Sequence, residues 1–298
     1  MNPVLPSRDG VGPSCVGLVP GPWPTMLDCL LERFAAIPAA EWLRRMLAQE
    51  VLDEFGVVVT PTRAYQAHIR LYYYRSVAQE ARIPFDEVLL FQDEHLVVAD
   101  KPHFLSVTPG GPHLQETLLV RLKKRLGLDA LQPIHRIDRE TAGVVVFCVQ
   151  PQERDAYHAL FREHAVHKTY QAIAPWRDDL ILPLTRHSRI AEGEPFFLQR
   201  ETPGMPNAST EVELLEVCEG RARYLLRPHT GQKHQLRVHM AALGMAIEND
   251  PFYPQVRRTR DEADDWTRPL QLLAKSIAFT DPVTGQERHF ESPRDLTL

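Results

Sequence analysis

A short charged segment, IHRIDRETAG at residues 134–143, contains the side chains best placed to do chemistry. Asp138 lies between Arg136 and Arg139, and the apolar run GVVVFCV that follows predicts a buried strand. A nearby positive charge lowers the pKa of an Asp by roughly 1–3 units, so Asp138 is expected to be ionised. Such a carboxylate could act as a nucleophile, a general base or a metal ligand, or it could be a structural partner of an arginine.

Residue spacing argues against two enzyme classes. The catalytic loop of a protein kinase needs Asp directly after Arg, with an Asn five positions later. Here Ile137 intervenes, and Gly143 occupies the later position. His229, His234 and His239 are five residues apart, which spreads them around a helix, unlike the HExxH pattern of a zinc enzyme. We therefore expect no metal site.

Composition predicts an ordinary globular protein. The 298 residues are 44% hydrophobic and 24% charged, enough to bury a sizeable core. The four cysteines are far apart and form no CxxC pair, which fits a reducing cytosol. Apolar stretches fall well short of the roughly 20 residues of a membrane span, and the N-terminus lacks a signal-peptide pattern. We expect a cytoplasmic protein without a membrane partner.

The charge pattern leaves nucleic-acid binding open. The formal net charge is −5, whereas proteins that bind a nucleic-acid backbone are usually basic. Clustered basic residues can still create a local positive patch, although solvated helix faces and loops are the simpler explanation of any one cluster. The clusters are RLKKR at 121–125, RARYLLR at 221–227 and RRTR at 257–260.

Hydrophobic periodicity predicts two units, a small module in residues 1–80 and a larger domain in residues 81–298. The first unit is expected to begin with an irregular arm. Helices at 26–36 and 39–55 and strands at 57–59 and 69–75 should follow it.

The larger domain reads as strands with a few helices inserted between them. The expected elements are strands at 87–91, 96–100, 143–150, 168–174, 210–217 and 222–228, helices at 117–126, 155–164 and 234–244, and a closing strand pair within 270–293. This order predicts an α+β protein with a mixed, largely antiparallel central sheet and flanking helices.

Two long segments resemble signatures of the RluA-type RNA pseudouridine synthases. IHRIDRETAG resembles the family motif H-R-L-D-R-(D/E)-T-S-G, and RPHTGQKHQLRVHMAALGMAIEND is similar to the family segment P-x-T-G-R-x-H-Q-I-R-V-H…G-x-P-I-x-G-D. Three shorter segments also match, namely VLLFQDEHLVVADKPHFLSVTPGG, HKTYQAIAP and LLAKSIAFTDPVTGQERHFESP. The five segments occur in the family order and together cover roughly residues 86–294.

The resemblance implies the pseudouridine synthase fold with an RNA-binding active-site cleft. It also implies conversion of a uridine in RNA to pseudouridine, without metal or cofactor. By motif position, Asp138 would be the catalytic aspartate. Whether it adds to the ribose, attacks the base or acts as a base at the ribose is open.

Three other residues match family positions with assigned roles. Arg136 would fill the stack vacated by the flipped base, because the scissile bond is otherwise enclosed by stacked neighbours. Tyr170 would stack on the flipped uracil and assist proton transfer, or it could simply be a packing aromatic on a strand. Arg237 would pair with Asp138, since a buried carboxylate without a partner is costly.

The resemblance further implies contacts with RNA outside the catalytic group. The residues expected to contribute are Lys101, Arg139, Lys233, His234 and Gln235. Arg139 could instead position the loop. Four positions depart from the family motifs, with Ala142 replacing Ser, Lys233 replacing Arg, Asn249 replacing Gly and Leu273 replacing His.

The sequence leaves the RNA target open between 23S-type ribosomal RNA and a transfer RNA stem-loop. We expect a monomer. Residues 1–80 could be a degenerate S4-like RNA-binding unit or a purely structural extension. The alternative function is a catalytically silent RNA-binding protein that retains the fold. The presence of Arg136, Asp138, Tyr170 and Arg237 together favours the enzyme, because a binding protein does not need a carboxylate facing phosphate-rich RNA.

Overall fold

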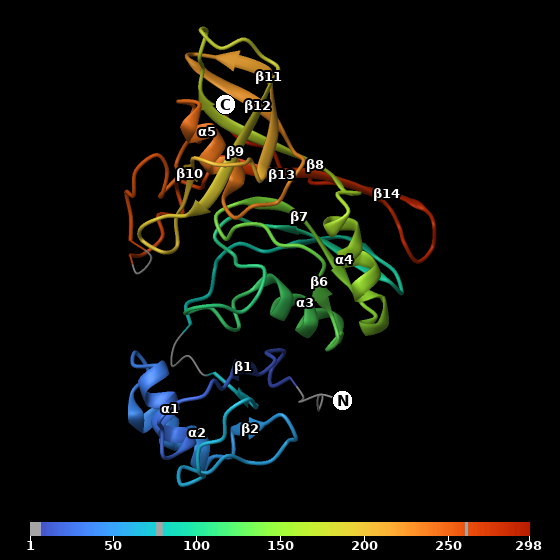
Figure 1. Cartoon of the computed structure of the whole chain (residues 1–298). Coiled ribbons are helices and arrows are strands. Elements are labelled where there is room, and N and C mark those ends of the chain that lie inside the picture. Colours follow the sequence, from blue (N-terminus) through green and yellow to red (C-terminus); the bar gives the residue numbers. More distant parts are fainter. Residues whose placement is uncertain (1–6, 76–79, 260–261) are drawn as a thin grey trace.

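The computed structural model describes residues 7–75, 80–259 and 262–298. These residues form a three-stranded sheet near the N-terminus and an eleven-stranded sheet in the rest of the chain. Figure 1 shows the small sheet and its two helices at one end of the molecule, next to the region of α3. No helix in the described segments is long and apolar enough to cross a membrane.

The N-terminal module has its own apolar core. Its elements are β1 (Ser14–Gly17), α1 (Met26–Arg33), α2 (Ala39–Leu47), β2 (Val51–Asp53) and β3 (Arg70–Tyr73), with strand order β1-β3-β2. Helix α1 begins at Thr25, whose hydroxyl accepts from the Asp28 amide while the Asp28 carboxylate accepts from the Thr25 amide. Met26, Leu30, Trp42 and Leu71 are buried between the helices and the sheet.

Three expectations for this module were wrong. The helix predicted at 39–55 ends at Leu47, because Gln49 adopts a left-handed φ of 58° and Val51–Asp53 pair with β3 instead. The arm predicted to be irregular contains strand β1. The segment predicted as a strand at 57–59 makes only an isolated bridge, between Val58 and Leu52.

The large sheet confirms the α+β prediction, with mixed and mainly antiparallel pairing. Its strand order is β10-β9-β11-β12-β8-β13-β7-β5-β4, with β14 paired to β13 and β6 paired to β7. The strands are β4 (Val88–Gln92), β5 (Leu96–Lys101), β6 (Gln132–Pro133), β7 (Ala142–Cys148), β8 (His167–Pro175), β9 (Leu184–Glu192), β10 (Gln199–Thr202), β11 (Ala208–Cys218), β12 (Arg221–Pro228), β13 (Leu272–Thr280) and β14 (Glu287–Glu291). Among the strand pairs described for this sheet, only that of β13 with β7 is parallel.

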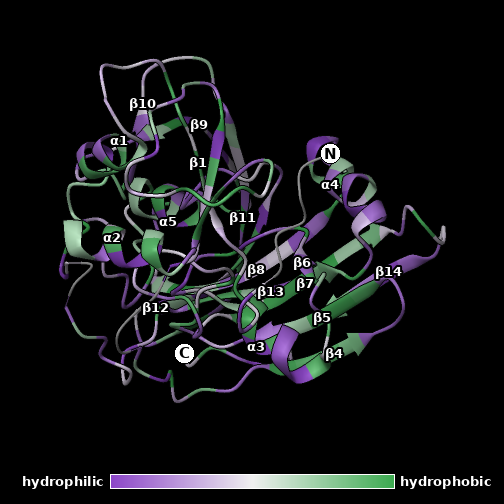
Figure 2. Ribbon diagram, turned by 90° about the horizontal axis from the view of Figure 1, so that it is seen from below, coloured by the Kyte–Doolittle hydropathy of each residue, from purple (hydrophilic) through white to green (hydrophobic). Residues whose placement is uncertain are grey.

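Helices cover the sheet where its strands are apolar on both faces. The helices are α3 (Leu118–Leu126), α4 (Arg154–Arg162) and α5 (Gln235–Ala242), and a short 3₁₀ turn at Pro151–Glu153 precedes α4. Alternate residues of β5 and β7 pack with α3 on one face and with Tyr157 of α4 on the other. Figure 2 shows hydrophobic residues concentrated along β5 and β7.

Strands β6, β9 and β10 were not predicted. The burial of β9 alternates only in part, and one of its inward residues is the polar Ser188, which bonds His239 Nε2 at 2.9 Å. Its apolar periodicity is therefore weak, and partner strands rather than local sequence define it.

Gly143 allows the catalytic segment to enter the centre of the sheet. Its φ is +117°, and a Cβ atom added there would lie 2.2 Å from the Ala274 carbonyl oxygen of β13. A side chain at position 143 would push the two strands apart.

Candidate active site

The loop that carries Asp138 is a tight connection between β6 and β7. The Ile134 amide donates to the Val146 carbonyl at 3.0 Å, and the Val146 amide donates to His135 Nε2 at 3.1 Å. Burial, helped by the charge of Lys168, lowers the pKa of His135 to about 3, so this nitrogen stays unprotonated and can accept. The Thr141 amide closes the turn by donating to the Asp138 carbonyl at 3.2 Å.

Arg237, on α5, contacts Asp138, which lies 99 positions earlier in the chain, as predicted. Its Nη1 lies 3.1 Å from Asp138 Oδ2, and the Arg237 side chain is fully buried while that of Asp138 is 25% exposed. The same nitrogen lies 3.4 Å from Glu140 Oε2. Arg237 therefore joins two carboxylates of the catalytic loop to a helix of the other half of the sheet.

Asp250 holds Arg237 in this orientation, and sequence reasoning did not assign it a role. Its two carboxylate oxygens accept from Arg237 Nε at 2.8 Å and Nη2 at 2.7 Å. Its Oδ1 also accepts from the amides of Phe252 and Tyr253. A forked pair of this kind fixes the plane of a guanidinium, which leaves Nη1 directed at Asp138. The sequence signal that could have identified Asp250 is the Asp that ends the matched family segment.

Asn249, which departs from the family glycine, has a φ of +59°. This left-handed conformation favours glycine, and asparagine tolerates it better than most residues. The departure therefore preserves the backbone turn that places Asp250.

The surroundings of Asp138 favour its ionised form. Burial alone would raise its pKa, but the charges of His234, Arg237 and Lys101, together with the hydrogen bond from Arg237, bring the pKa below its ordinary value. Burial lowers the pKa of His234 below its ordinary value, so His234 is largely uncharged at neutral pH. Arg237 stays positively charged beside the carboxylate, and its carboxylate neighbours hold its own pKa above the ordinary range.

Tyr170 and Arg136 both remain available to a substrate. Tyr170 lies on β8, half-buried and near enough to Asp138 that burial and this charge together raise its pKa, so its hydroxyl keeps its proton. Arg136 is exposed. Within the described part of the chain, neither the Tyr170 hydroxyl nor the Arg136 guanidinium forms a hydrogen bond or ion pair with another residue.

Arg139 is held inside the protein by Asp264. Its Nη1 donates to Asp264 Oδ1 at 2.9 Å, its Nη2 pairs with Asp264 Oδ2, and Arg258 binds the same carboxylate. Burial would raise the pKa of Asp264, but its hydrogen bonds to the two arginines lower it to about 2. Of the two roles considered for Arg139, this geometry supports positioning of the loop.

Two of the expected RNA contacts are contradicted by burial. Lys101 is fully buried, and its Nζ donates to the carbonyls of Pro102 at 2.9 Å and Arg139 at 3.1 Å. Gln235 is 3% exposed, and its amide group bonds Thr230, Gln232, Ser209 and Thr210. Both side chains are instead engaged in hydrogen bonds within the protein.

His234 and Lys233 lie at the start of α5. His234 has a left-handed φ of 55°, its Nδ1 lies 2.8 Å from the Tyr253 hydroxyl, and its ring stacks near Phe252. Because the Gln199 amide already donates to the Tyr253 oxygen, the hydroxyl proton is free to be donated to His234. Lys233 is exposed, so an RNA contact by this residue stays a prediction.

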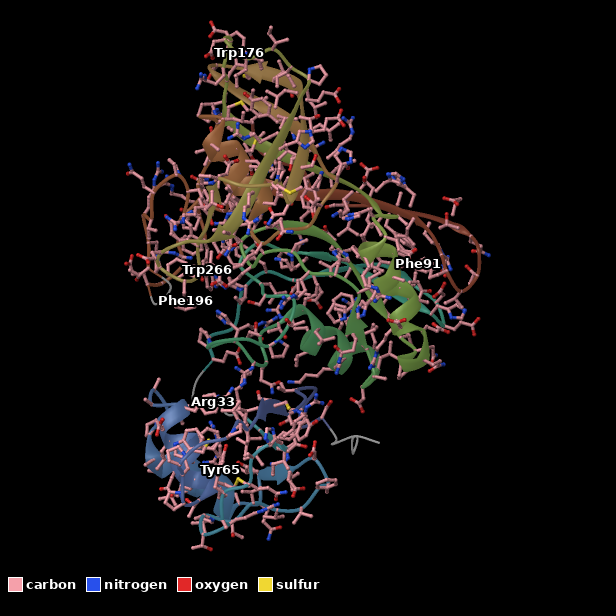
Figure 3. The ribbon with its side chains drawn as sticks, viewed as in Figure 1. Arg33, Tyr65, Phe91, Trp176, Phe196 and Trp266 are labelled. Atoms are coloured by element: carbon pink, nitrogen blue, oxygen red, sulfur yellow. The ribbon has the colours of Figure 1, made fainter. Side chains whose placement is uncertain are left out.

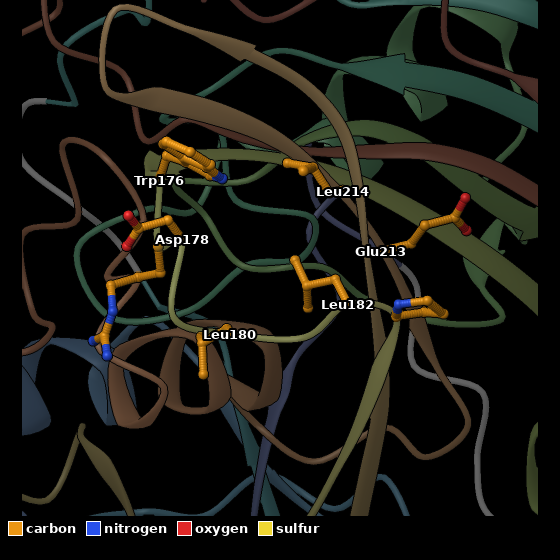
Figure 4. A pocket seen from close by; sticks show the side chains of 8 residues that line it. Trp176, Asp178, Leu180, Leu182, Glu213 and Leu214 are labelled. Carbon is orange, nitrogen blue, oxygen red and sulfur yellow. The ribbon is translucent and has the colours of Figure 1, made fainter.

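A cavity in the described structure lies away from these residues. It has a volume of about 480 Å³ and is lined by Trp176, Leu182 and Leu214 among others (Figure 4). In Figure 3, Trp176 lies at the end of the large sheet far from Arg33 and Tyr65 of the N-terminal module. The predicted RNA-binding cleft over Asp138 stays a prediction. Among the described residues, no group of three or more His, Cys, Asp or Glu side chains could hold a metal ion.

The chain is similar in sequence to known RNA pseudouridine synthases. A family described as RNA pseudouridylate synthase matches residues 95–242. The dual-specificity RNA pseudouridine synthase RluA of Haemophilus influenzae is 31% identical over 218 residues, which cover 70% of this chain and 93% of that protein. The RluA protein of Escherichia coli K12 is 31% identical over 216 residues, covering 70% of this chain and 94% of that protein.

Solved structures show the same fold. Human RNA pseudouridylate synthase domain containing 1 has a TM-score of 0.58 and 19% identity, and the match covers 72% of this chain and 86% of that one. Human RNA pseudouridylate synthase domain containing 4 has a TM-score of 0.53 and 24% identity, covering 70% and 88%.

Fold and sequence together define an RNA-modifying isomerase. The chain belongs to the RluA-type RNA pseudouridine synthase family, whose members convert uridine to pseudouridine within RNA. RNA is accordingly its substrate, and the alternative of a catalytically silent binding protein gains no support.

Proposed function

We propose that this chain isomerises a specific uridine in 23S-type ribosomal RNA or in a transfer RNA stem-loop, as a cytoplasmic monomer without a cofactor. Asp138 is the reacting group. The observation that carries the proposal is the contact between Asp138 and the buried Arg237, which holds an ionised carboxylate at a partly exposed position. The similar RluA proteins are named dual-specificity enzymes, which supports testing both classes of RNA.

The geometry supports a separate role for each of the four residues matched to family positions. Arg136, exposed and unpaired within the described residues, enters the stack when the uridine is extruded. Tyr170 stacks on the extruded base and offers a protonated hydroxyl. Asp138 acts while the glycosidic bond breaks, and Arg237 stabilises its charge. Lys233 and His234 contact RNA beside this group.

We also propose that residues 1–80 are a module separate from the catalytic domain at 81–298. The apolar cluster that contains Trp42 draws all of its buried members from residues 16–73, which supports an independent core.

Purified protein incubated with transcribed 23S-type ribosomal RNA fragments and with transfer RNAs tests the target. Pseudouridine formed at one site, located by chemical mapping and absent with Asp138→Asn, is the expected result. Absence of product on both RNA classes, with the protein folded, would contradict the proposed target.

Replacing Arg136 with Ala should lower kcat/KM by about 10- to 100-fold on a structured stem-loop, since extruding a stacked base costs a few kcal/mol. The loss should be smaller on an unstructured RNA of the same local sequence, because less stacking must be broken. Single-turnover assays on both RNAs measure the difference. Arg82→Ala, at an arginine whose side chain is 78% exposed, serves as the control. Equal losses on both RNAs would contradict the role.

Tyr170→Phe should reduce kcat by about 10²-fold while leaving KM within about threefold, because it removes a proton donor and keeps the stacking ring. Tyr170→Ala should raise KM as well, since base stacking on an aromatic ring contributes about 1–3 kcal/mol. Steady-state kinetics separate the two effects. Unchanged kcat in Tyr170→Phe would show that the ring alone is used.

A further inference from the structure

Two side chains, one at the end of β5 and one just after it, bond the backbone immediately after Asp138. Lys101 Nζ donates to the Arg139 carbonyl at 3.1 Å, and His103 Nδ1 lies 2.7 Å from the Glu140 carbonyl. These carbonyls are consecutive. A carbonyl oxygen only accepts, so the His103 ring must carry its proton on Nδ1.

The His103 contact fixes one complete peptide group. The Glu140 carbonyl and the Thr141 amide belong to the same planar unit. His103 holds its oxygen, and the Asp138 carbonyl accepts from its N–H at 3.2 Å. A planar group held at both ends cannot rotate, so the turn that begins at Asp138 is locked in one orientation. The same contact places Glu140, whose carboxylate shares Arg237 Nη1 with Asp138.

Close packing does not explain the position of the ring. His103 lines a cavity of about 300 Å³, together with Leu273 and residues of the C-terminal tail. Leu273 occupies the position where the family motif has a histidine. The imidazole that lines this cavity belongs instead to His103, in the segment after β5. With open space on one side, the hydrogen bond to the Glu140 carbonyl and the edge contact with the Phe104 ring restrain the imidazole.

The backbone next to His103 is strained, which shows that the surrounding structure enforces its conformation. Phe104 is 5% exposed and has a φ of +65°, a left-handed value that is unusual for a bulky residue. Such strain persists only where neighbouring contacts over-determine the backbone. Phe104 packs into the apolar cluster that contains Leu105, and its ring stacks on Phe85 at a centroid distance of 6.1 Å.

We infer that His103 is a positioning residue of the catalytic loop, acting through the peptide group between Glu140 and Thr141. The inference rests on the proposed catalytic role of Asp138. Burial lowers the pKa of His103 to about 4, so the ring is neutral and retains a single N–H at the working pH of a cytoplasmic enzyme.

Comparing His103→Phe with His103→Asn tests the inference. Phe keeps a ring but has no donor, and the Asn amide places an N–H close to the position of Nδ1. We expect kcat of His103→Phe to fall about fivefold to tenfold with KM within twofold, in line with the loss of one hydrogen bond. His103→Asn should retain at least half of the wild-type kcat. A purely structural role would not produce this split between kcat and KM or this rescue.

His95→Phe is the matched control. His95 is also partly buried and uses Nδ1 to bind a carboxylate, that of Glu153 at 3.0 Å, but it makes no contact with the catalytic loop. Its kcat should equal that of the wild type. All variants are compared at a temperature where circular dichroism shows each to be folded, and His103→Ala replaces His103→Phe if the latter does not fold.

Two results would overturn the inference, namely an unchanged kcat in His103→Phe or equal impairment in His103→Asn. Either result would leave the proposed function intact, provided that the wild type makes pseudouridine and Asp138→Asn does not. An inactive wild type, or an active Asp138→Asn, would instead remove the proposed function on which the inference rests.

Discussion

Asp138→Asn is expected to abolish pseudouridine formation, lowering turnover by at least about 10³-fold, as is typical when an essential catalytic group is removed. Asn matches Asp in size but cannot be ionised, so it loses the charge that Arg237 holds in place. RNA affinity should stay within about threefold of the wild type, because the contacts that bind RNA are unchanged. Single-turnover product formation and filter binding measure the two quantities separately.

Asp155→Asn provides the control for Asp138→Asn. The Asp155 side chain is 89% exposed and forms an ion pair with Arg162 on α4. This variant should keep wild-type turnover. If Asp138→Asn retained more than a tenth of the wild-type rate, the carboxylate could not be the reacting group.

Arg237→Met is expected to have the largest effect on stability. It would leave three carboxylates, those of Asp138, Glu140 and Asp250, without the cation they share. Removing one partner of a buried ion pair typically costs about 3–5 kcal/mol of unfolding free energy, because the remaining charge is uncompensated. Chemical denaturation at neutral pH measures the loss. The unfolding free energy of Arg237→Lys should fall between those of the wild type and Arg237→Met. Lysine keeps the charge but cannot form the forked contact with Asp250.

Arg237→Met should also change the pH dependence of turnover. In the wild type the positive neighbours depress the pKa of Asp138, so the carboxylate is ionised over the whole range above that value, and activity falls only as the pH drops through it. Without Arg237 the pKa rises, and the acid limb of the pH–rate profile moves toward neutral pH. An unmoved acid limb, or a stability within about 1 kcal/mol of the wild type, would contradict the role assigned to Arg237.

Replacing both members of the Arg237–Asp250 ion pair, rather than Arg237 alone, gives a further control. Arg237→Met combined with Asp250→Leu removes the most tightly joined charges together, and apolar replacement of a whole buried pair is often close to neutral. The double variant should regain part of the lost stability. It should not regain turnover, because Asp138 still lacks its partner.

Local sequence was sufficient to predict the strongly patterned elements. Strands β5 and β7 are apolar on both faces, and α3 has a clear helical period with a Thr117 cap, so each was predicted close to its true bounds. Strand β9 was missed because its identity depends on pairing with β10 and β11 rather than on its own residues. The over-long helix at 39–55 failed because apolar periodicity does not show the left-handed turn at Gln49.

The site was predictable only in part, for a different reason. Motif matching brought Asp138 and Arg237 together correctly. It could not show that Lys101 and Gln235 are buried, since polar residues in a motif look alike whether they face solvent or backbone carbonyls. Asp250, Glu140 and His103 reach Asp138 only through contacts with other residues, and no local pattern marks such an indirect contact.

The position of β13 has a consequence for how the enzyme becomes active during folding. Asp138 precedes β7 and Tyr170 lies on β8, and these two strands are joined only through β13 in the described sheet. Until β13 inserts between them, both strands present open edges that invite mispairing. Pairing strands so distant in sequence is also intrinsically slow. Catalytic competence should therefore emerge late in refolding, after most helix signal has been recovered, because a late segment of the chain joins the two halves of the site.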